Sequence, residues 1–147
     1  MDLCTPPIAV PQVTPAYGQA STGICELSQR FFFDAAHTLH RTIETEGSLR
    51  VHGHTYHAEV TVSGEPDEHT GMVIDLAYLR AQIERVRESL DHRFLDEIHG
   101  LAPATLERLC MYIRDQLRGA LPGLCCVQVE RRASGDRCML RCASPNF

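Results

Sequence analysis

The sequence contains no lysine, because all 14 of its basic residues are arginine. This absence excludes Schiff-base chemistry, the lysine of a phosphate-binding loop and a catalytic lysine base. No apolar run approaches the ~18 residues that a membrane-spanning helix requires. The start of the chain also lacks the basic residues and apolar block of a secretory signal, so we expect a cytoplasmic protein.

Positive charge is scarce as well. The 19 acidic residues outnumber the 14 arginines and give a net charge of −5. Nucleic-acid binding depends on an excess of basic side chains. We therefore expect neither a nucleic acid nor a membrane among the partners of this protein.

The sequence also lacks any CxxC motif, and its 7 cysteines are odd in number. These facts argue against a full disulfide framework and against a cysteine-type structural zinc site. We expect reduced thiols that are mostly buried as small apolar groups. The residues concerned are Cys4, Cys25, Cys110, Cys125, Cys126, Cys138 and Cys142.

The size and composition suit one globular domain, with 147 residues of which 44% are hydrophobic and 22% charged. Residues 1–23 are rich in proline and contain Asp2 as their one charged residue. This composition predicts a flexible N-terminal arm. Residues 24–147 are then expected to form the single folded domain.

Apolar patterns predict the strands of this domain. Residues 24–37 are rich in β-forming side chains, and residues 55–63 alternate between apolar and polar, so both are predicted to be strands. The polar segment 38–51 between them predicts a long hairpin loop. Two further strands are predicted over residues 125–131 and 137–142.

Two helices are predicted between these hairpins. Asp75 is a suitable N-cap, and apolar residues recur after it at helical spacing as far as Leu90. A second apolar helical face begins after Thr105. The order β-β-α-α-β-β predicts an α+β domain with two helices on one face of a four-stranded antiparallel sheet. Because such a sheet has two open edges, we expect an oligomer in which neighbouring subunits close them.

The clearest chemical signal is the pair His52 and His54 at the head of the second strand. Side chains at positions i and i+2 of a strand point to the same face, so the two imidazoles converge. His37, near the end of the first strand, is expected to lie beside them, whereas His57 has the opposite parity. Three neutral histidines with an open position are typical of a catalytic zinc site. Surface histidines without any ligand remain the alternative.

Asp91 and His92 form a second candidate constellation at the end of the first helix. A neighbouring carboxylate can orient a histidine and raise its basicity, which suits proton transfer. The alternative is a helix C-terminus at which His92 only interacts favourably with the helix dipole.

Five motifs occur in order over residues 27–141. They are Phe33-Asp-Ala-Ala-His37, His52-Gly-His54, Gly71-Met-Val-Ile-Asp75, Leu90-Asp-His92 with Leu95, and Pro103-Ala-Thr105 with Glu107. Together they resemble the family of 6-pyruvoyl tetrahydropterin synthase and 6-carboxy-5,6,7,8-tetrahydropterin synthase. The resemblance implies the tunnelling fold (T-fold), in which such subunits form an oligomeric barrel. It also implies a homo-hexamer built as a dimer of trimers, with active sites at subunit interfaces.

The same resemblance implies roles for individual residues. His37, His52 and His54 would hold one zinc ion per subunit, and Asp91 and His92 would belong to the catalytic relay. Thr105 and Glu107 would lie near the pterin pocket.

The implied substrate is 7,8-dihydroneopterin triphosphate. Of the two branches of the family, we expect the carboxy branch, which loses triphosphate and acetaldehyde and supplies queuosine biosynthesis. The pyruvoyl branch, and a divergent paralogue that binds a pterin or related ligand without this catalysis, are the alternatives.

The sequence departs from the family pattern at two positions. Ser48 stands where family members usually carry a catalytic cysteine, and a serine hydroxyl is much less acidic than a thiol (pKa ~8.5). Glu46 is a candidate replacement base, with a solvated loop acid as the alternative. Arg131 stands where the family has a pterin-anchoring glutamate. Glu130, one residue earlier, would face the pterin only if a bulge reversed its direction; otherwise it is an exposed strand charge.

Overall fold

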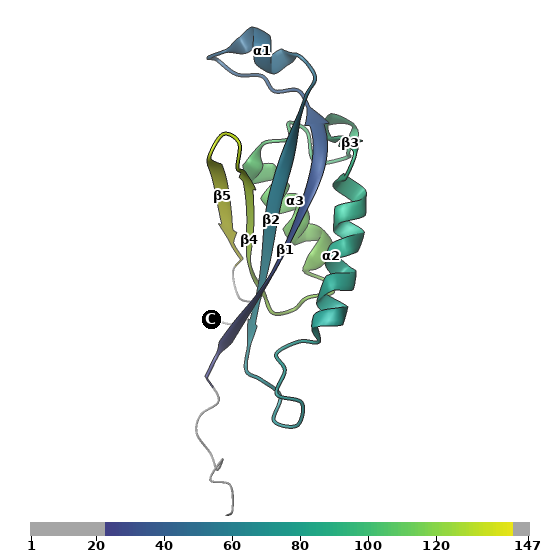
Figure 1. Ribbon diagram of the computed structural model, residues 1–147, viewed down its shortest axis with the longest axis vertical. Coiled ribbons are helices and arrows are strands. Elements are labelled where there is room, and N and C mark those ends of the chain that lie inside the picture. The colour runs from purple at the N-terminus through teal and green to yellow at the C-terminus, as the bar shows by residue number, and fades with distance from the viewer. Residues whose placement is uncertain (1–22, 143–147) are drawn as a thin grey trace, which may run out of the picture.

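The computed structural model describes residues 23–142, so the predicted arm over residues 1–23 lies outside the described residues apart from Gly23. Figure 1 shows a long curved β-hairpin with two helices packed beside it. The elements in order are β1 (Cys25–His37), α1 (Thr45–Leu49), β2 (His52–Gly64), α2 (Leu76–Leu90), β3 (Arg93–Phe94), the 3-10 turn η1 (Leu95–Glu97), α3 (Leu106–Leu117), β4 (Leu124–Arg131) and β5 (Asp136–Arg141).

Within residues 23–142 the strands form one five-stranded sheet in the order β3-β1-β2-β4-β5. The pairs β1–β2, β2–β4 and β4–β5 are antiparallel, as predicted, but β3 pairs with β1 in parallel. The four-stranded, purely antiparallel prediction is therefore corrected to a mixed five-stranded sheet. The added strand has two residues, which is too short to show any periodicity in the sequence. It forms where the chain leaves α2 and the His92 backbone N–H donates to the Asp34 carbonyl oxygen.

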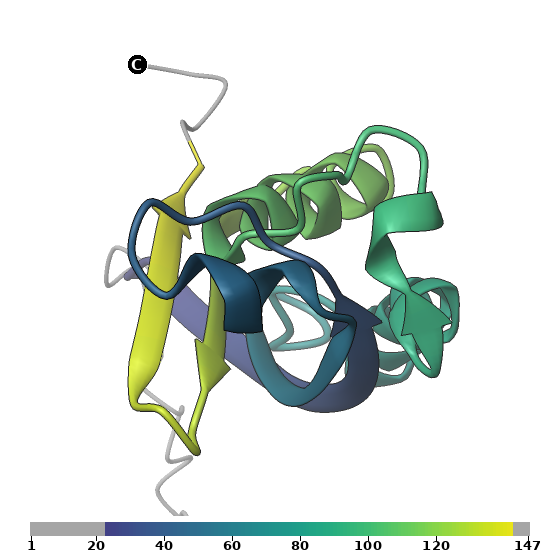
Figure 2. The same cartoon turned by 90° about the horizontal axis from the view of Figure 1, so that it is seen from above.

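Both long helices cover the same face of the sheet, as Figure 2 shows from above. The α2 helix begins where the Asp75 carboxylate accepts a hydrogen bond from the Ala77 N–H, and it packs on β1. The α3 helix begins where the Thr105 hydroxyl accepts from the Arg108 N–H, and it packs on β4 and β5. None of the helices within residues 23–142 is long and apolar enough to span a membrane.

The core lies between these helices and the sheet. Alternate residues are buried there from Phe33 onward in β1 and from Tyr56 to Val60 in β2. Burial of side chains of this kind contributes about 1.5–3 kcal/mol each. The same alternation continues to the end of the hairpin, where Ala35 pairs with His54 and His37 pairs with His52. The helix-facing side of the hairpin thus changes from a hydrophobic core into a group of histidines.

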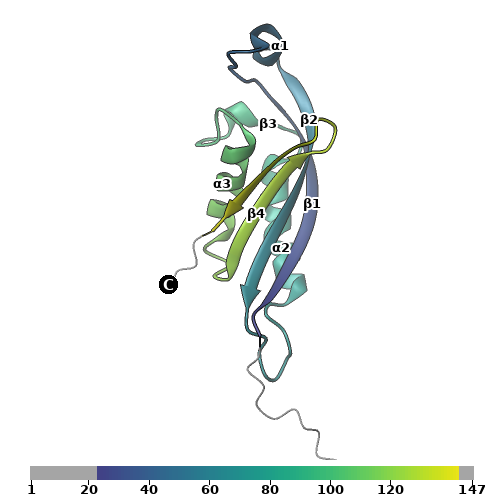
Figure 3. The ribbon, with the colours of Figure 1, turned by 90° about the vertical axis from the view of Figure 1, so that its left-hand side faces the viewer.

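The predicted hairpin loop over residues 38–51 contains a short helix, α1. Glu44 precedes it in the left-handed backbone region with φ 58°. The loop closes on itself through a hydrogen bond from the Leu39 N–H to the Ser48 carbonyl oxygen. Figure 3 shows α1 projecting beyond the end of the sheet.

The six cysteines within residues 23–142 are free thiols. Cys110 is buried, Cys25 is exposed and the other four are partly buried. The expectation of reduced thiols agrees with this arrangement. Burial is complete for Cys110 and partial for Cys125, Cys126 and Cys138, because the β4–β5 hairpin that carries these three lies at the edge of the sheet.

Candidate metal centre

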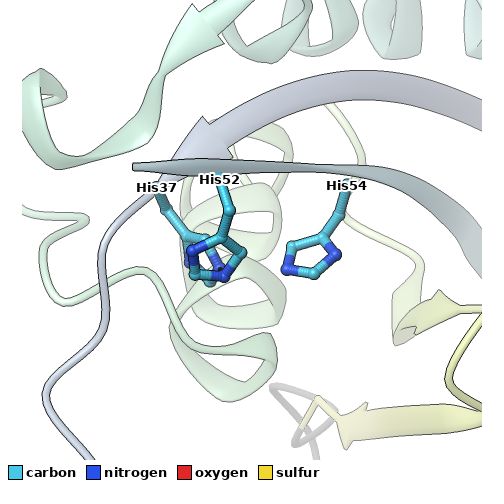
Figure 4. A group of neighbouring side chains, drawn as sticks. All are labelled: His37, His52 and His54. Atoms are coloured by element: carbon cyan, nitrogen blue, oxygen red, sulfur yellow. Dashed lines mark hydrogen bonds between the residues drawn. The ribbon is translucent and has the colours of Figure 1, made fainter. Parts of the chain in front are cut away.

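Three histidines gather at the end of the β1–β2 hairpin, and Figure 4 shows their rings turned toward one another. His37 comes from the last position of β1, and His52 and His54 come from the start of β2. One ring nitrogen from each lies within 4.8 Å of those of the other two. The strand register produces this convergence, because residues two apart on β2 share a face and His37 is paired directly with His52.

Backbone carbonyl groups fix the proton positions on two of the rings. His37 is 2% exposed, and its Nδ1 lies 2.9 Å from the Ala104 carbonyl oxygen. The Nδ1 of His52 lies 2.8 Å from the Arg50 carbonyl oxygen. A carbonyl oxygen can only accept, so each Nδ1 carries the hydrogen and each Nε2 presents a lone pair. The two Nε2 atoms lie 3.1 Å apart.

Two facing lone pairs at that distance repel each other unless a proton or a cation lies between them. Ligands of a tetrahedral zinc ion with Zn–N bonds of ~2.0–2.1 Å have nitrogen atoms about 3.3 Å apart. The donor set therefore fits a zinc ion, and the Nδ1 hydrogen bonds are the outer contacts that orient metal-binding histidines. With three protein ligands, zinc would keep an open position and supply Lewis-acid chemistry to a bound substrate.

Burial favours the neutral, metal-binding form of His37 and His54. Burial, with the positive charge of Arg131 as the next cause, lowers the pKa of His54 to about 4. Burial also lowers the pKa of His37, although the hydrogen bond to Ala104 opposes this shift. Neutral imidazoles offer their lone pairs without first releasing a proton.

A cavity of about 250 Å³ lies beside His52 and His54, and Ser48 contributes to its wall. Ser48 is buried, and its hydroxyl donates to the Thr45 carbonyl oxygen at 3.0 Å. Glu46, the candidate replacement base, is exposed on α1 and is not part of this wall. The structure thus brings Ser48 next to the histidines and leaves Glu46 facing solvent.

Thr105 and Glu107 line a neighbouring cavity of about 430 Å³ together with Tyr56 and Arg131. Thr105 is at the same time the N-cap of α3. The Tyr56 hydroxyl is buried and, among residues 23–142, has no hydrogen-bond partner. Sequence reasoning did not single out Tyr56. The sequence places it two residues after His54, so on a strand it shares the face of the histidines.

Asp91 and His92 contact each other through Oδ2 and Nδ1 at 3.1 Å. Asp91 also accepts from the Asp34 N–H and from Arg87, each at 2.9 Å. The hydrogen bond from the Asp34 backbone is the main cause that lowers the pKa of Asp91. His92 is 79% exposed, and no hydrogen bond within residues 23–142 joins this pair to the three histidines. It lines a separate cavity of about 510 Å³, although His54 reaches the wall of that cavity too.

Asp34 also belongs to this second group, together with Asp91 and His92. Its carboxylate accepts from the Thr55 hydroxyl across the β1–β2 pair at 2.5 Å. Sequence reasoning missed Asp34, because its proximity to Asp91 depends on the parallel return of the chain along β1.

Glu130 lies on the opposite face of the sheet from the histidines. It is paired with His57, and its carboxylate accepts from Arg132 at 2.8 Å, which lowers the pKa of Glu130. The register shift between β2 and β4 occurs at Thr61 and Val62, far from this point, so no bulge turns Glu130 around. Arg131 faces the histidines instead.

Comparison with known proteins identifies the family. Residues 26–140 match the family model described as 6-pyruvoyl tetrahydropterin synthase. The chain is 38% identical over 106 residues to 6-pyruvoyl tetrahydrobiopterin synthase of Drosophila melanogaster, and the match covers 63% of each protein. It is 36% identical over 111 residues to the human protein of that name, covering 66% of this chain and 77% of the human one. The chain thus spans slightly less than two thirds of the Drosophila relative.

A further relative carries a different activity in its name. The chain is 36% identical over 94 residues to dihydroneopterin monophosphate aldolase of Pyrococcus furiosus, with 64% of this chain and 75% of that protein covered.

Solved structures agree with these matches. The 6-pyruvoyl tetrahydropterin synthase of Caenorhabditis elegans superposes with a TM-score of 0.73 at 26% identity, covering 83% of this chain and 98% of that one. The Plasmodium vivax enzyme superposes with a TM-score of 0.60 at 19% identity, covering 82% and 99%, and shows the shared fold alone. The subunit therefore has the tunnelling fold, and the chain belongs to the 6-pyruvoyl tetrahydropterin synthase family.

Proposed function

We propose that the protein is a zinc-dependent lyase that converts 7,8-dihydroneopterin triphosphate into 6-carboxy-5,6,7,8-tetrahydropterin. One observation carries the zinc-dependent part of this proposal. The facing Nε2 lone pairs of His37 and His52, 3.1 Å apart with both Nδ1 hydrogens fixed on carbonyl oxygens, form a site that a cation stabilises. The family match supports the pterin substrate.

In this proposal His37, His52 and His54 would hold the zinc ion, and the bound metal would supply Lewis-acid chemistry toward the hydroxyl groups of the substrate side chain. The Asp91 carboxylate fixes the His92 ring through its Nδ1 hydrogen, so the His92 Nε2 is free to take and return a proton. Ser48 lies beside the histidines, but its hydroxyl is a poor base without assistance. Glu46, which is exposed on α1 in the same loop, is the carboxylate proposed to compensate.

We further propose a homo-hexamer with each active site at a subunit interface, and a cytoplasmic location. Within residues 23–142, β5 is an edge strand with one side unpaired, and such edges are commonly closed by another chain. Within residues 23–142, no hydrogen bond joins the exposed His92 to the three histidines of its own subunit. This separation supports an active site in which one subunit supplies the three histidines and another supplies Asp91 and His92.

A second candidate is the elimination of triphosphate alone, as in a 6-pyruvoyl tetrahydropterin synthase. The names of the animal relatives favour it. The aldolase relative from Pyrococcus furiosus favours instead a carbon–carbon cleavage of a dihydroneopterin phosphate. A divergent paralogue that binds such a ligand without turnover is the third possibility.

The test is to incubate the zinc-loaded protein with 7,8-dihydroneopterin triphosphate and, separately, with the monophosphate, and to identify products by mass spectrometry. We expect 6-carboxy-tetrahydropterin together with acetaldehyde from the triphosphate. A 6-pyruvoyl product would establish the second candidate, and cleavage of the monophosphate alone would establish an aldolase. No conversion of either compound with zinc fully bound would contradict a lyase. His37→Ala serves as the inactive control.

A further inference from the structure

Arg131 is the cation nearest to the three histidines. Its Nη1 lies 3.4 Å from the Nε2 of His54, and its side chain is 13% exposed. Its Nη2 donates to Asp136 at 2.6 Å, across the β4–β5 pair. The Nε of Arg131 is buried and has no hydrogen-bond partner among residues 23–142. A buried N–H without an acceptor is costly, so this guanidinium is only partly satisfied by the protein.

Metal binding would leave the Arg131 guanidinium with one fewer hydrogen-bond acceptor. The Nε2 of His54 has one lone pair, which at present faces Arg131. Coordination of a cation by this nitrogen uses the same lone pair, so Arg131 then loses that acceptor. The guanidinium would also lie close to a second positive charge. An anion between the two would supply the missing acceptors and offset the repulsion between the two cations.

Basic side chains line the surrounding cavities, together with the acidic Glu44, Glu107 and Asp136. The cavity beside His52 and His54 and the one beside Tyr56 share Arg131, Arg41 and Asp136 in their walls. Arg137 lines the second cavity as well. Asp136 is 47% exposed and engages Arg131 at Nη2 through one oxygen, so the Nη1 that faces His54 is not used by this carboxylate.

Arginine offers only donors, so the group that it recognises must be an acceptor. A phosphate or a carboxylate meets this condition. An amino-pyrimidine edge, which presents N–H donors, does not. We propose that Arg131 forms an anion subsite next to the metal centre and that the phosphate end of the substrate, rather than its ring, binds there. The choice of phosphate rests on the proposed function, whereas the anion subsite follows from the contacts of Arg131.

The test measures binding to the zinc-loaded protein by calorimetry with three probes: inorganic phosphate, acetate and 7,8-dihydroneopterin, which carries no phosphate. We expect the wild type to bind phosphate more tightly than acetate. Arg131→Gln should weaken phosphate binding at least tenfold and leave dihydroneopterin binding unchanged. Arg132→Gln is the matched control, because Arg132 contacts Glu130 on the other face, and its phosphate affinity should equal that of the wild type.

A second variant separates recognition from a structural role. Asp136→Asn removes the competing carboxylate, so phosphate should bind several-fold more tightly if Arg131 is an anion subsite. Unchanged phosphate binding in Arg131→Gln would overturn the proposal, as would an equal loss of dihydroneopterin binding in that variant. Tighter binding of acetate than of phosphate would keep the subsite but assign it to carboxylates.

The outcome is independent of the lyase test. Zinc content is measured on every variant. Loss of zinc from Arg131→Gln would show that Arg131 maintains the metal centre, and it would overturn the anion subsite. If the protein turns over a pterin while Arg131→Gln binds phosphate normally, the proposed function stands and the subsite fails. If phosphate binding depends on Arg131 but no pterin is converted, the subsite stands and the lyase fails.

Discussion

The Nε2 atoms of His37 and His52 lie 3.1 Å apart, although each ring already donates its Nδ1 hydrogen to a backbone carbonyl oxygen. Neither nitrogen can donate to the other while both rings are neutral. The hairpin register that pairs these residues therefore builds a place for a positive charge into the end of the fold.

Zinc content should depend on this pair. We expect about one zinc ion per chain in the wild type and less than a tenth of that in His37→Ala and in His52→Ala, because two remaining ligands bind zinc weakly. Elemental analysis after dialysis measures it. His57→Ala, on the same strand but the opposite face, should keep its zinc. Full zinc retention in His37→Ala would show that the metal is held elsewhere.

The relay histidine should affect turnover and leave the metal in place. His92 is 79% exposed and, among residues 23–142, its side chain makes a polar contact with Asp91 alone, so His92→Ala should fold and bind zinc normally. Turnover should fall at least a hundredfold, in line with the loss of a general acid–base group. Steady-state kinetics and zinc content on the same sample measure both effects. Retained turnover would remove His92 from the mechanism.

Ser48 offers a gain-of-function test. A thiol ionises far more readily than a serine hydroxyl, with a pKa of ~8.5, so Ser48→Cys should raise the rate if this position still faces the reacting atoms. The Ser48 side chain lies in the cavity wall beside His52, where a sulfur atom would have similar reach. A lower rate in Ser48→Cys would instead give the serine hydroxyl a role of its own.

Glu46 should matter only if it replaces the missing thiol. Glu46→Gln removes the charge with almost no change in shape, and turnover should then fall at least tenfold. Glu88→Gln, at an exposed position of α2, is the control with the same chemical change. An unchanged rate in Glu46→Gln would leave this residue as a solvated loop acid.

Asp91 should stabilise the protein in a pH-dependent manner. Its pKa is lowered in the folded state, so its contribution is present above the ordinary value of 3.8 and is lost as pH falls through the lower folded value. Asp91→Asn should lower the free energy of unfolding by about 1–2 kcal/mol at pH 7, as expected for hydrogen bonds to a charged group. Urea unfolding at pH 7, 5 and 3 should show this difference shrinking at pH 3. A constant difference would exclude the ionised carboxylate as its source.

The sequence predicted the parts of the fold that repeat. The β-forming composition of residues 24–37 predicts β1, the apolar alternation of residues 55–63 predicts β2, and the N-caps Asp75 and Thr105 mark where the two helices begin. Strand parity also predicts that His52 and His54 share one face, and the structure agrees. Metal binding by these histidines stays a prediction. Neither β3 nor α1 was predicted, because each is too short to have a period and depends on tertiary contacts.

The surroundings of the histidines were harder to predict. Whether Glu130 or Arg131 faces them depends on the presence of a bulge, which leaves no reliable trace in one sequence. The contact between Arg131 and His54 joins β4 to β2, and the contact of Asp34 with Asp91 joins β1 to the end of α2. Such long-range side-chain contacts follow from how the elements pack and not from local spacing.

The segment that carries Ser48 and Glu46 begins directly after His37 and ends directly before His52. The strand pairing of these two histidines already closes residues 38–51, and a cation bound by both would add its binding free energy to the stability of that closure. Metal loading would therefore protect this segment from proteases as well as supply chemistry. The same ion that activates a substrate would fix the shape of the wall against which the substrate lies.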